Sequence, residues 1–166
     1  MKIEKLDNKF GINARNLIDL TKEKSLSGAL ACIETFYYAF NNRDLDVFNE
    51  IWLNHDLIQL NNPLGGIIRG IVPISEMYDR IFNGQARVWV ELSDIVMYQS
   101  DDTVIFAGRE IGESSSNDNT IDLQIRTTRI FGFSETDNQW FQIHHHGSID
   151  DAHLLERYQK SVKSKD

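Results

Sequence analysis

Residues 126–149, RTTRIFGFSETDNQWFQIHHHGSI, have the pattern of two strands joined by a tight turn. Apolar and polar residues alternate from Ile121 into this stretch, which is typical of a strand with one buried face. Thr136-Asp137-Asn138 supplies the turn, and Trp140 to Ser148 continues as the last strand. We therefore predict an antiparallel hairpin at the C-terminal end of a sheet.

Two further strands precede this hairpin, at residues 88–98 and 103–113. The apolar residues of the first alternate, with Val90 on its buried face, but they lose phase near Asp94, which indicates a bulge. The polar tract GESSSNDNT at 112–120 has nothing apolar to bury. We expect this tract to be an exposed, mobile loop.

Three amphipathic helices come before these strands. Ser27 is placed to cap a helix of about four turns, Asp44 caps a shorter one, and a third runs from Pro73 to Asn83. A short strand at 56–62 separates the second helix from the third. Helices followed by a run of strands are typical of an α+β fold rather than of a parallel doubly wound sheet.

The composition fits one globular domain. The chain has 166 residues, of which 41% are hydrophobic and 25% charged. We divide it into an N-terminal extension at 1–27, a pocket domain at 28–160 and a polar tail at 161–166, with a closing helix beginning near Asp150.

The charge and the cysteine content limit the partners and the compartment. A formal net charge of −8 disfavours binding to nucleic acid and to anionic membranes. Cys32 is the one cysteine and cannot form an intrachain disulfide, and the sequence contains neither a signal peptide nor a membrane helix. We expect a cytoplasmic protein.

Two arginines carry the strongest indication of a site. Arg109 has the parity of the apolar Ile105, and Arg129 has the parity of the apolar residues on its own strand, so both are expected to point inward. A buried guanidinium needs a carboxylate, carbonyl groups or an anionic ligand. The alternatives are an anion-binding site at the bottom of a pocket, an internal ion pair, for example with Glu34 or Asp94, and a strand end that reaches water.

Three consecutive histidines lie on the last strand. His145 shares parity with Phe141 and Ile143 and is the better inward candidate, although a bulge would reverse this assignment. His145 is a candidate general base or ligand donor. His144 and His146 then share the other face. A metal pair lacks a third ligand, so hydrogen-bonded imidazoles in a pocket wall or a subunit contact remain the simpler interpretation.

Other side chains are candidates for the lining of a pocket. Asn62 ends the short strand beside a Gly-Gly turn, where it either faces the ligand or stabilises the turn. Tyr78 and Trp89 belong to elements expected around the cavity, although aromatic residues at such spacing also serve as plain core. The chain has no phosphate-binding loop, nucleophile elbow or dinucleotide fingerprint.

ALACIETFYYAFNNRDLDVF at 29–48, NNPLGGIIRG at 61–70 and the stretch 126–149 together resemble SnoaL-like members of the nuclear transport factor 2-like superfamily. The last stretch is also similar to the association domain of calcium/calmodulin-dependent kinases. The resemblance implies a cone of curved antiparallel sheet around N-terminal helices, a deep pocket and a homodimer. The kinase likeness implies pocket arginines at Arg109 and Arg129, while a third falls on Gly147.

These observations lead to three functional hypotheses. The first is a pocket protein for a small, partly apolar ligand with an acidic group, bound by Arg109, Arg129, Asn62, Tyr78, Trp89 and His145. The second is an isomerase, cyclase or dehydratase that acts on a ketone with His145 as the catalytic base. The third is a non-catalytic dimerisation module. None of them requires a cofactor or a metal.

Overall fold

One curved sheet organises the chain, and the computed structural model describes residues 1–116 and 119–163 of it. Within these residues the sheet has seven strands in the order β1-β4-β5-β6-β7-β2-β3. All neighbours are antiparallel except β2 and β7, which are parallel. The strands are β1 (Lys2–Leu6), β2 (Gln59–Asn61), β3 (Ile67–Arg69), β4 (Arg87–Gln99), β5 (Thr103–Ser116), β6 (Asn119–Ser134) and β7 (Gln139–Ser148).

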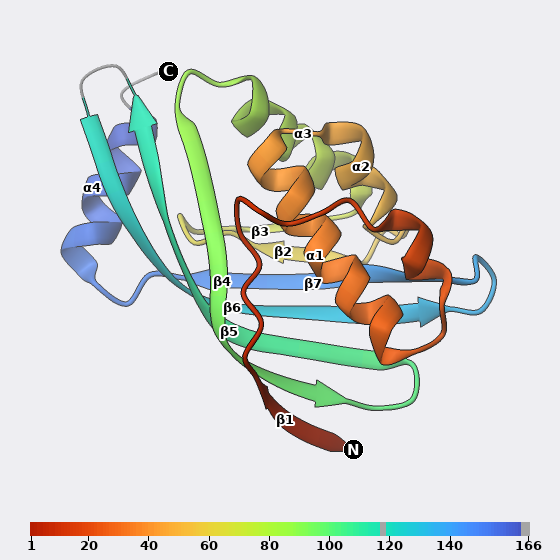
Figure 1. Cartoon of the computed structure of the whole chain (residues 1–166). Coiled ribbons are helices and arrows are strands. Elements are labelled where there is room, and N and C mark those ends of the chain that lie inside the picture. Colours follow the sequence, from red (N-terminus) through yellow and green to blue (C-terminus); the bar gives the residue numbers. More distant parts are fainter. Residues whose placement is uncertain (117–118, 164–166) are drawn as a thin grey trace.

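Two bulges bend the four long strands β4 to β7. The pairing of β4 with β5 shifts between Ser93 and Val96, and Asp94 has the left-handed φ of 51° that such a bend requires. The pairing of β6 with β7 shifts between Ile130 and Phe131, which confines the extra residue of β7 to the segment between Gln142 and His144. The sheet therefore curves around the helices (Figure 1).

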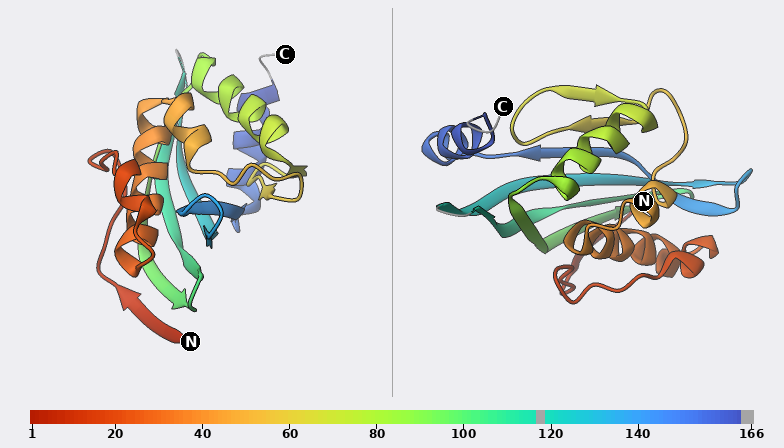
Figure 2. Two further views of the ribbon diagram at one scale, coloured as in Figure 1. Left: turned by 90° about the vertical axis from the view of Figure 1, so that its right-hand side faces the viewer. Right: turned by 90° about the horizontal axis from the view of Figure 1, so that it is seen from above.

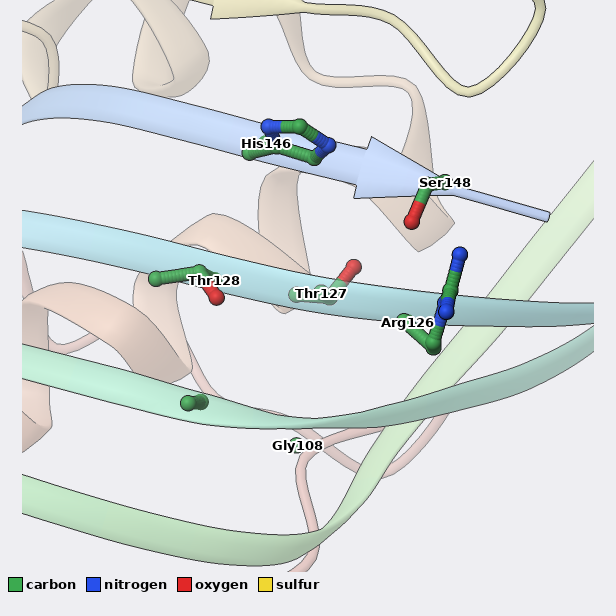
Figure 3. A pocket seen from close by; sticks show the side chains of 7 residues that line it. Gly108, Arg126, Thr127, Thr128, His146 and Ser148 are labelled. Carbon is green, nitrogen blue, oxygen red and sulfur yellow. The ribbon is translucent and has the colours of Figure 1, made fainter. Parts of the chain in front are cut away.

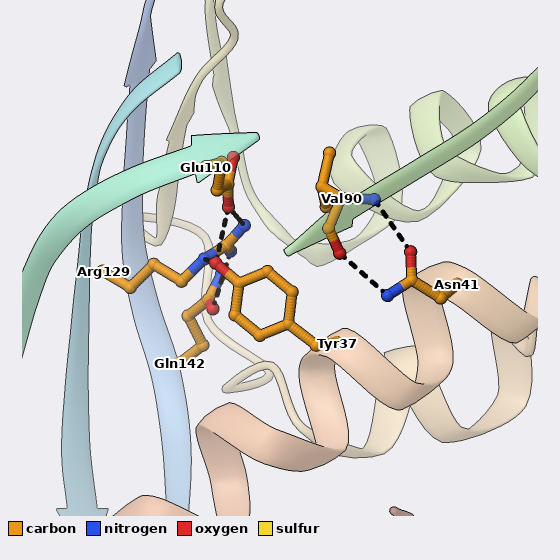
Figure 4. Close-up of polar contacts among 6 residues, drawn as sticks. All are labelled: Tyr37, Asn41, Val90, Glu110, Arg129 and Gln142. Atoms are coloured by element: carbon orange, nitrogen blue, oxygen red, sulfur yellow. Dashed lines mark hydrogen bonds and ion pairs between the residues drawn. The ribbon is translucent and has the colours of Figure 1, made fainter. Parts of the chain in front are cut away.

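Three helices lie on the inner face of this sheet (Figures 1 and 2). They are α1 (Leu26–Asn42), α2 (Leu45–Glu50) and α3 (Ile71–Asn83). Asp44 caps α2 by accepting a hydrogen bond from the backbone of Val47, as predicted, whereas the cap of α1 is Ser25 rather than Ser27. Asn41 of α1 fixes the helix to the sheet because its side-chain amide both donates to and accepts from the backbone of Val90 (Figure 4).

The space between helices and sheet is filled with aromatic rings. Phe36 of α1, Phe48 of α2 and Tyr78 of α3 are almost fully buried and contact one another. A fourth helix, α4 (Ala152–Lys163), lies apart from the others, near the place where β5 ends and β6 begins (Figure 1). Its Tyr158 packs against the edge of the same core.

The α+β class and the cone-shaped sheet around N-terminal helices are confirmed. The polar tract at 112–120 was wrongly predicted as a loop, because β5 continues to Ser116 and β6 begins at Asn119, and only 117–118 lie outside the described residues. Residues 1–27 contain β1 and the short 3-10 helix η1 (Ile18–Lys22). In the described part of the chain, no helix combines the length and the apolarity needed to span a membrane.

Candidate functional site

A polar cluster occupies the centre of the otherwise apolar interior (Figure 4). Arg129 comes from β6, Glu110 from β5, Gln142 from β7 and Tyr37 from α1. Each of these residues is at most 3% exposed. Three neighbouring strands and the longest helix thus bring together four polar groups that are far apart in sequence.

Arg129 is the hub of this cluster. Its Nη2 lies 2.9 Å from Glu110 Oε1, its Nε donates to the Tyr37 hydroxyl at 3.0 Å, and its Nη1 donates to Gln142 Oε1 at 3.1 Å. The Tyr37 hydroxyl in turn donates to Glu110 Oε1 at 2.5 Å. The guanidinium carbon also lies 3.6 Å from the centre of the Phe36 ring, a cation–π contact. The fixed positive charge is therefore neutralised inside the protein.

The cluster changes the ionisation of its neighbours. Burial opposes the charge of Arg129, yet Tyr37 and Glu110 together hold its pKa above the ordinary value. Burial raises the pKa of Tyr37 well above its ordinary value and raises the pKa of Tyr78 to about 12. Both phenols are consequently protonated at neutral pH, and that of Tyr37 donates its hydrogen bond to Glu110.

His145 lies directly opposite Arg129 across the β6–β7 pair and is 4% exposed. Burial lowers the pKa of His145 well below its ordinary value, and the charge of Arg129 lowers it further. The ring is therefore neutral, with one nitrogen as a donor and the other as an acceptor.

Several polar atoms around Arg129 lack a hydrogen-bond partner among the described residues. They are both ring nitrogens of His145, the hydroxyl of Thr127 and Nε2 of Gln142. Buried polar groups in native proteins nearly always have a partner, whether protein, water or ligand. This arrangement can therefore receive a small group that both donates and accepts hydrogen bonds.

Arg109 does not belong to this cluster, so the prediction that it points inward was wrong. It is exposed on the outer face, while Val104, Phe106 and Glu110 of the same strand are buried. The alternation was ambiguous because both parities of β5 carry apolar residues. The large ring of Phe106 lies on the inner face, and the other even-numbered residues of β5 therefore face inward as well.

Trp89 and Asn62 also lie elsewhere than predicted. Trp89 alternates with the buried Val90 and is half-buried on the outer face of β4, so its assignment to the cavity wall was wrong. Asn62 accepts a hydrogen bond from the backbone of Leu64 at 2.8 Å and directs its amide nitrogen to the sulfur of Met77. It stabilises the turn, which was the alternative interpretation.

His145 points inward as predicted, but for a different reason. The inward residues at the start of β7 are Trp140 and Gln142, so Phe141 and Ile143 do not share the inner face. The bulge then reverses the parity and turns His145 inward. The prediction was correct because two effects cancel: Phe141 and Ile143 do not face inward, and the bulge changes the facing of the residues after it.

Glu110 and Gln142 are members of this cluster that the sequence argument missed. Glu110 was not among the candidates, because the parity that was expected to turn Arg109 inward would have turned Glu110 outward. A signal was present nonetheless, because a buried arginine needs a compensating group and Glu110 offers a carboxylate on the neighbouring predicted strand. Among the described residues, no group of three or more His, Cys, Asp or Glu side chains is arranged to hold a metal ion.

The sequence model of the SnoaL-like domain family matches residues 29–152. This range is most of the chain and contains the whole cluster. The chain belongs to the SnoaL-like family. No curated protein matches the sequence. The predicted resemblance to SnoaL-like proteins is confirmed by this match, and similar solved structures have the predicted nuclear transport factor 2-like fold.

Three of these structures illustrate the likeness of this SnoaL-like domain. A proposed dehydratase of the NTF2-like family from Streptomyces avermitilis has a TM-score of 0.69 at 16% identity, covering 76% of this chain and 97% of that chain. An uncharacterised cystatin-like protein from Caulobacter vibrioides has a TM-score of 0.64 at 18% identity, covering 85% and 99%. A proposed calcium/calmodulin-dependent protein kinase type II association domain from Thiobacillus denitrificans has a TM-score of 0.59 at 23% identity, covering 74% and 94%. At these identities the likeness concerns the fold alone.

Proposed function

We propose that this SnoaL-like domain binds a small, partly apolar molecule whose neutral oxygen, a carbonyl or a hydroxyl, reaches the Arg129 cluster. The observation that carries the proposal is the set of unpartnered atoms on His145, Thr127 and Gln142. Leaving such atoms buried and unpaired costs about 1–3 kcal/mol for each group. A ligand oxygen, or a water in its absence, would accept hydrogen bonds from the donors of this set, and a hydroxyl would also donate to the acceptor nitrogen of His145.

The charge balance argues for a neutral ligand rather than an acidic one. The expected acidic group depended on two uncompensated inward arginines. Arg109 lies outside, and Arg129 is already paired with Glu110 at 2.9 Å. An added carboxylate would leave the interior with one negative charge in excess, which burial strongly disfavours. A ketone or an alcohol adds no charge.

The apolar part of the ligand would lie against the aromatic side of the interior. Phe36, Phe48 and Tyr78 contact one another within this core, and the ring of Phe36 also lies 6.5 Å from that of His145. Planar rings stack favourably on such a surface. The proposed ligand is therefore a ring system of modest size with one polar end.

Access requires movement, because the cluster is almost inaccessible to solvent. The helix α4 is the natural cover. It contacts the core through Tyr158, and Gln159 donates a hydrogen bond to the backbone of Leu64 at 3.0 Å. We propose that α4 swings away from this end of the cone to admit the ligand.

A matched pair of probes tests the proposal. 2-Acetylnaphthalene is a neutral ketone, and 2-naphthoate presents the same rings with a carboxylate. We expect the ketone to raise the melting temperature of the wild type in a saturable way and the acid to have little effect. Thr127→Val should weaken the response to the ketone, whereas Thr120→Val, an exposed threonine of the same strand, should preserve it.

Two outcomes would contradict the proposal. A stronger response to 2-naphthoate would restore the acidic ligand that the sequence suggested. An equal response of Thr127→Val and Thr120→Val would place the binding outside the cluster.

A second candidate function is that of an isomerase, cyclase or dehydratase acting on a ketone. It is favoured by one observation, a neutral imidazole opposite a guanidinium. His145 would take a proton from the carbon next to the carbonyl, and Arg129 would stabilise the enolate oxygen that forms. Deuterium exchange of the methyl protons of 2-acetylnaphthalene, followed by NMR, tests this step. Exchange that His145→Gln abolishes supports it, and exchange at the rate of buffer alone excludes it for this probe.

The outer face of the sheet carries apolar residues that favour self-association. Ile105 and Ile130 face each other on the outer side of the sheet and are only half-buried, so a second copy could cover them. We propose a homodimer through these residues, which sedimentation velocity tests directly. A cytoplasmic location stays a prediction from the single Cys32.

A further inference from the structure

A hollow of about 400 Å³ lies on the outer face of the sheet, on the opposite side from the Arg129 cluster. Figure 3 shows that its side chains come from three adjacent strands, β5, β6 and β7. The lining residues are Ala107, Gly108, Arg126, Thr127, Thr128, His146 and Ser148. Ala107 and Gly108 supply almost no side-chain volume, which leaves room between their larger neighbours.

The strand register explains why polar groups meet here. Ala107, Thr128 and His146 lie opposite one another in one row across the three strands. Arg126 and Ser148 face each other in the next row. A guanidinium, an imidazole and two hydroxyl groups therefore border one hollow, and all four can donate hydrogen bonds.

A second arginine reinforces the positive charge. Arg109 is the direct cross-strand partner of Arg126, so two like charges stand side by side on an exposed face. Such a pair is destabilising without a compensating anion. Within residues 1–116 and 119–163, neither guanidinium has an ion-pair or side-chain hydrogen-bond partner. The chain as a whole carries a charge of −8, which makes this uncompensated pair more unusual.

The acidic groups of the same face do not neutralise the pair. Glu113 and Asp122 oppose each other on β5 and β6, four residues further along each strand, a separation of about 13 Å. Glu91 lies diagonally across β4, where its side chain adjoins Gly11.

We propose that this hollow binds a small oxyanion group, a phosphoryl or a carboxylate group, through Arg126, Thr128, His146 and Ser148, with Arg109 adding to the local positive charge. His146 Nδ1 lies 3.3 Å from the amide nitrogen of Asn61, which leaves the other ring nitrogen for the anion. The combination of a planar guanidinium with hydroxyl donors is well suited to tetrahedral or planar oxyanions. This site is independent of the interior ligand, because Arg126 and Arg129 lie on opposite faces of β6.

Titration with inorganic phosphate and, separately, with malonate at constant ionic strength tests the proposal and distinguishes the two sources of the oxyanion. Backbone amide signals in NMR spectra report the site. We expect saturable shifts confined to residues around Arg126, Thr128 and Ser148. Arg126→Gln should weaken binding at least about tenfold, since it removes a charge-assisted hydrogen bond. Arg87→Gln, an exposed arginine on the same face of β4, removes the same charge and should change the affinity less than about twofold.

Three results would overturn the proposal. Shifts that rise without saturation for both anions would indicate only general screening. An equal loss in Arg87→Gln and Arg126→Gln would indicate net charge rather than a site. A wild-type dimer that Arg126→Glu dissociates regardless of phosphate, as sedimentation velocity would reveal, would mean that a second copy of the chain rather than a small oxyanion covers the hollow.

Discussion

Replacing Glu110 with glutamine removes the buried negative charge while keeping the shape of the side chain. Glu110 and Arg129 are 3% and 1% exposed, so water has little access to either group. Unit charges at their 2.9 Å separation attract by about 6 kcal/mol at an effective dielectric constant of about 20. Part of this attraction offsets the cost of taking both charges out of water. Breaking a buried pair from one side typically costs about 3–5 kcal/mol, and we expect Glu110→Gln to lower the free energy of unfolding by that amount.

Urea unfolding at neutral pH, followed by tryptophan fluorescence, measures this loss. The set comprises the wild type, Glu110→Gln, Arg129→Met and the double variant. The double variant should lose less than the sum of the single losses, because it leaves no charge unpaired. Glu156→Gln is the control, since Glu156 forms an exposed ion pair with Lys160 and should matter little.

The reasoning would be refuted by a small effect. If Glu110→Gln lowers the free energy of unfolding by less than about 1 kcal/mol, the pair is hydrated and the interior is not closed. Additive losses in the double variant would show that Glu110 and Arg129 do not interact.

Three further predictions concern single positions. The pKa of His145 is held well below its ordinary value in the folded chain. As the pH falls below about 6.5, His145 therefore becomes protonated in the unfolded chain but stays neutral in the folded chain. Stability should then fall by up to about 1.4 kcal/mol per pH unit. Urea titrations across this range should show that His145→Gln removes this slope and that His144→Gln, at a half-buried ring, removes less of it. Gly147→Ala would bring a methyl group to 2.8 Å from Pro63. It should lower the free energy of unfolding by about 1–3 kcal/mol, as measured by thermal unfolding. An unchanged stability would mean that the turn carrying Pro63 moves aside at little cost. Asp94 has a φ of 51°, which favours glycine and disfavours branched residues. Asp94→Gly should leave the stability unchanged or raise it by up to about 1 kcal/mol, and Asp94→Val should lower it by about 1–2 kcal/mol. Equal stabilities of the two variants would argue against the bulge.

The contact of Gly147 with Pro63 also explains a departure from the kinase association pattern. That pattern has a third pocket arginine at this position. Here Gly147 is buried against Pro63, so a long side chain would not fit without moving the turn. Among the residues that the structure describes, the interior therefore has one buried arginine with its own carboxylate, rather than a group of free arginines.

Local periodicity was sufficient for the class of the fold and for one inward charge. On β6 the apolar residues, Ile130 and Gly132 aside, stand at odd-numbered positions (Ile121, Leu123, Ile125, Phe131 and Phe133), so the buried position of Arg129 followed from the spacing alone. The bulge at Asp94 was likewise visible as a break in alternation. Such features depend on the geometry of a single strand, which the order of its residues encodes directly.

Only the tertiary structure decided which face of β5 turns inward and which groups meet there. Both parities of that strand are apolar, so the choice depends on how Phe106 packs against its neighbours on adjacent strands. That choice brings Glu110 to Arg129 and sends Arg109 to the outer face beside Arg126. Alternation is a property of one strand, whereas the partner of a charge is set by register and packing between strands, and no single stretch of sequence contains that information.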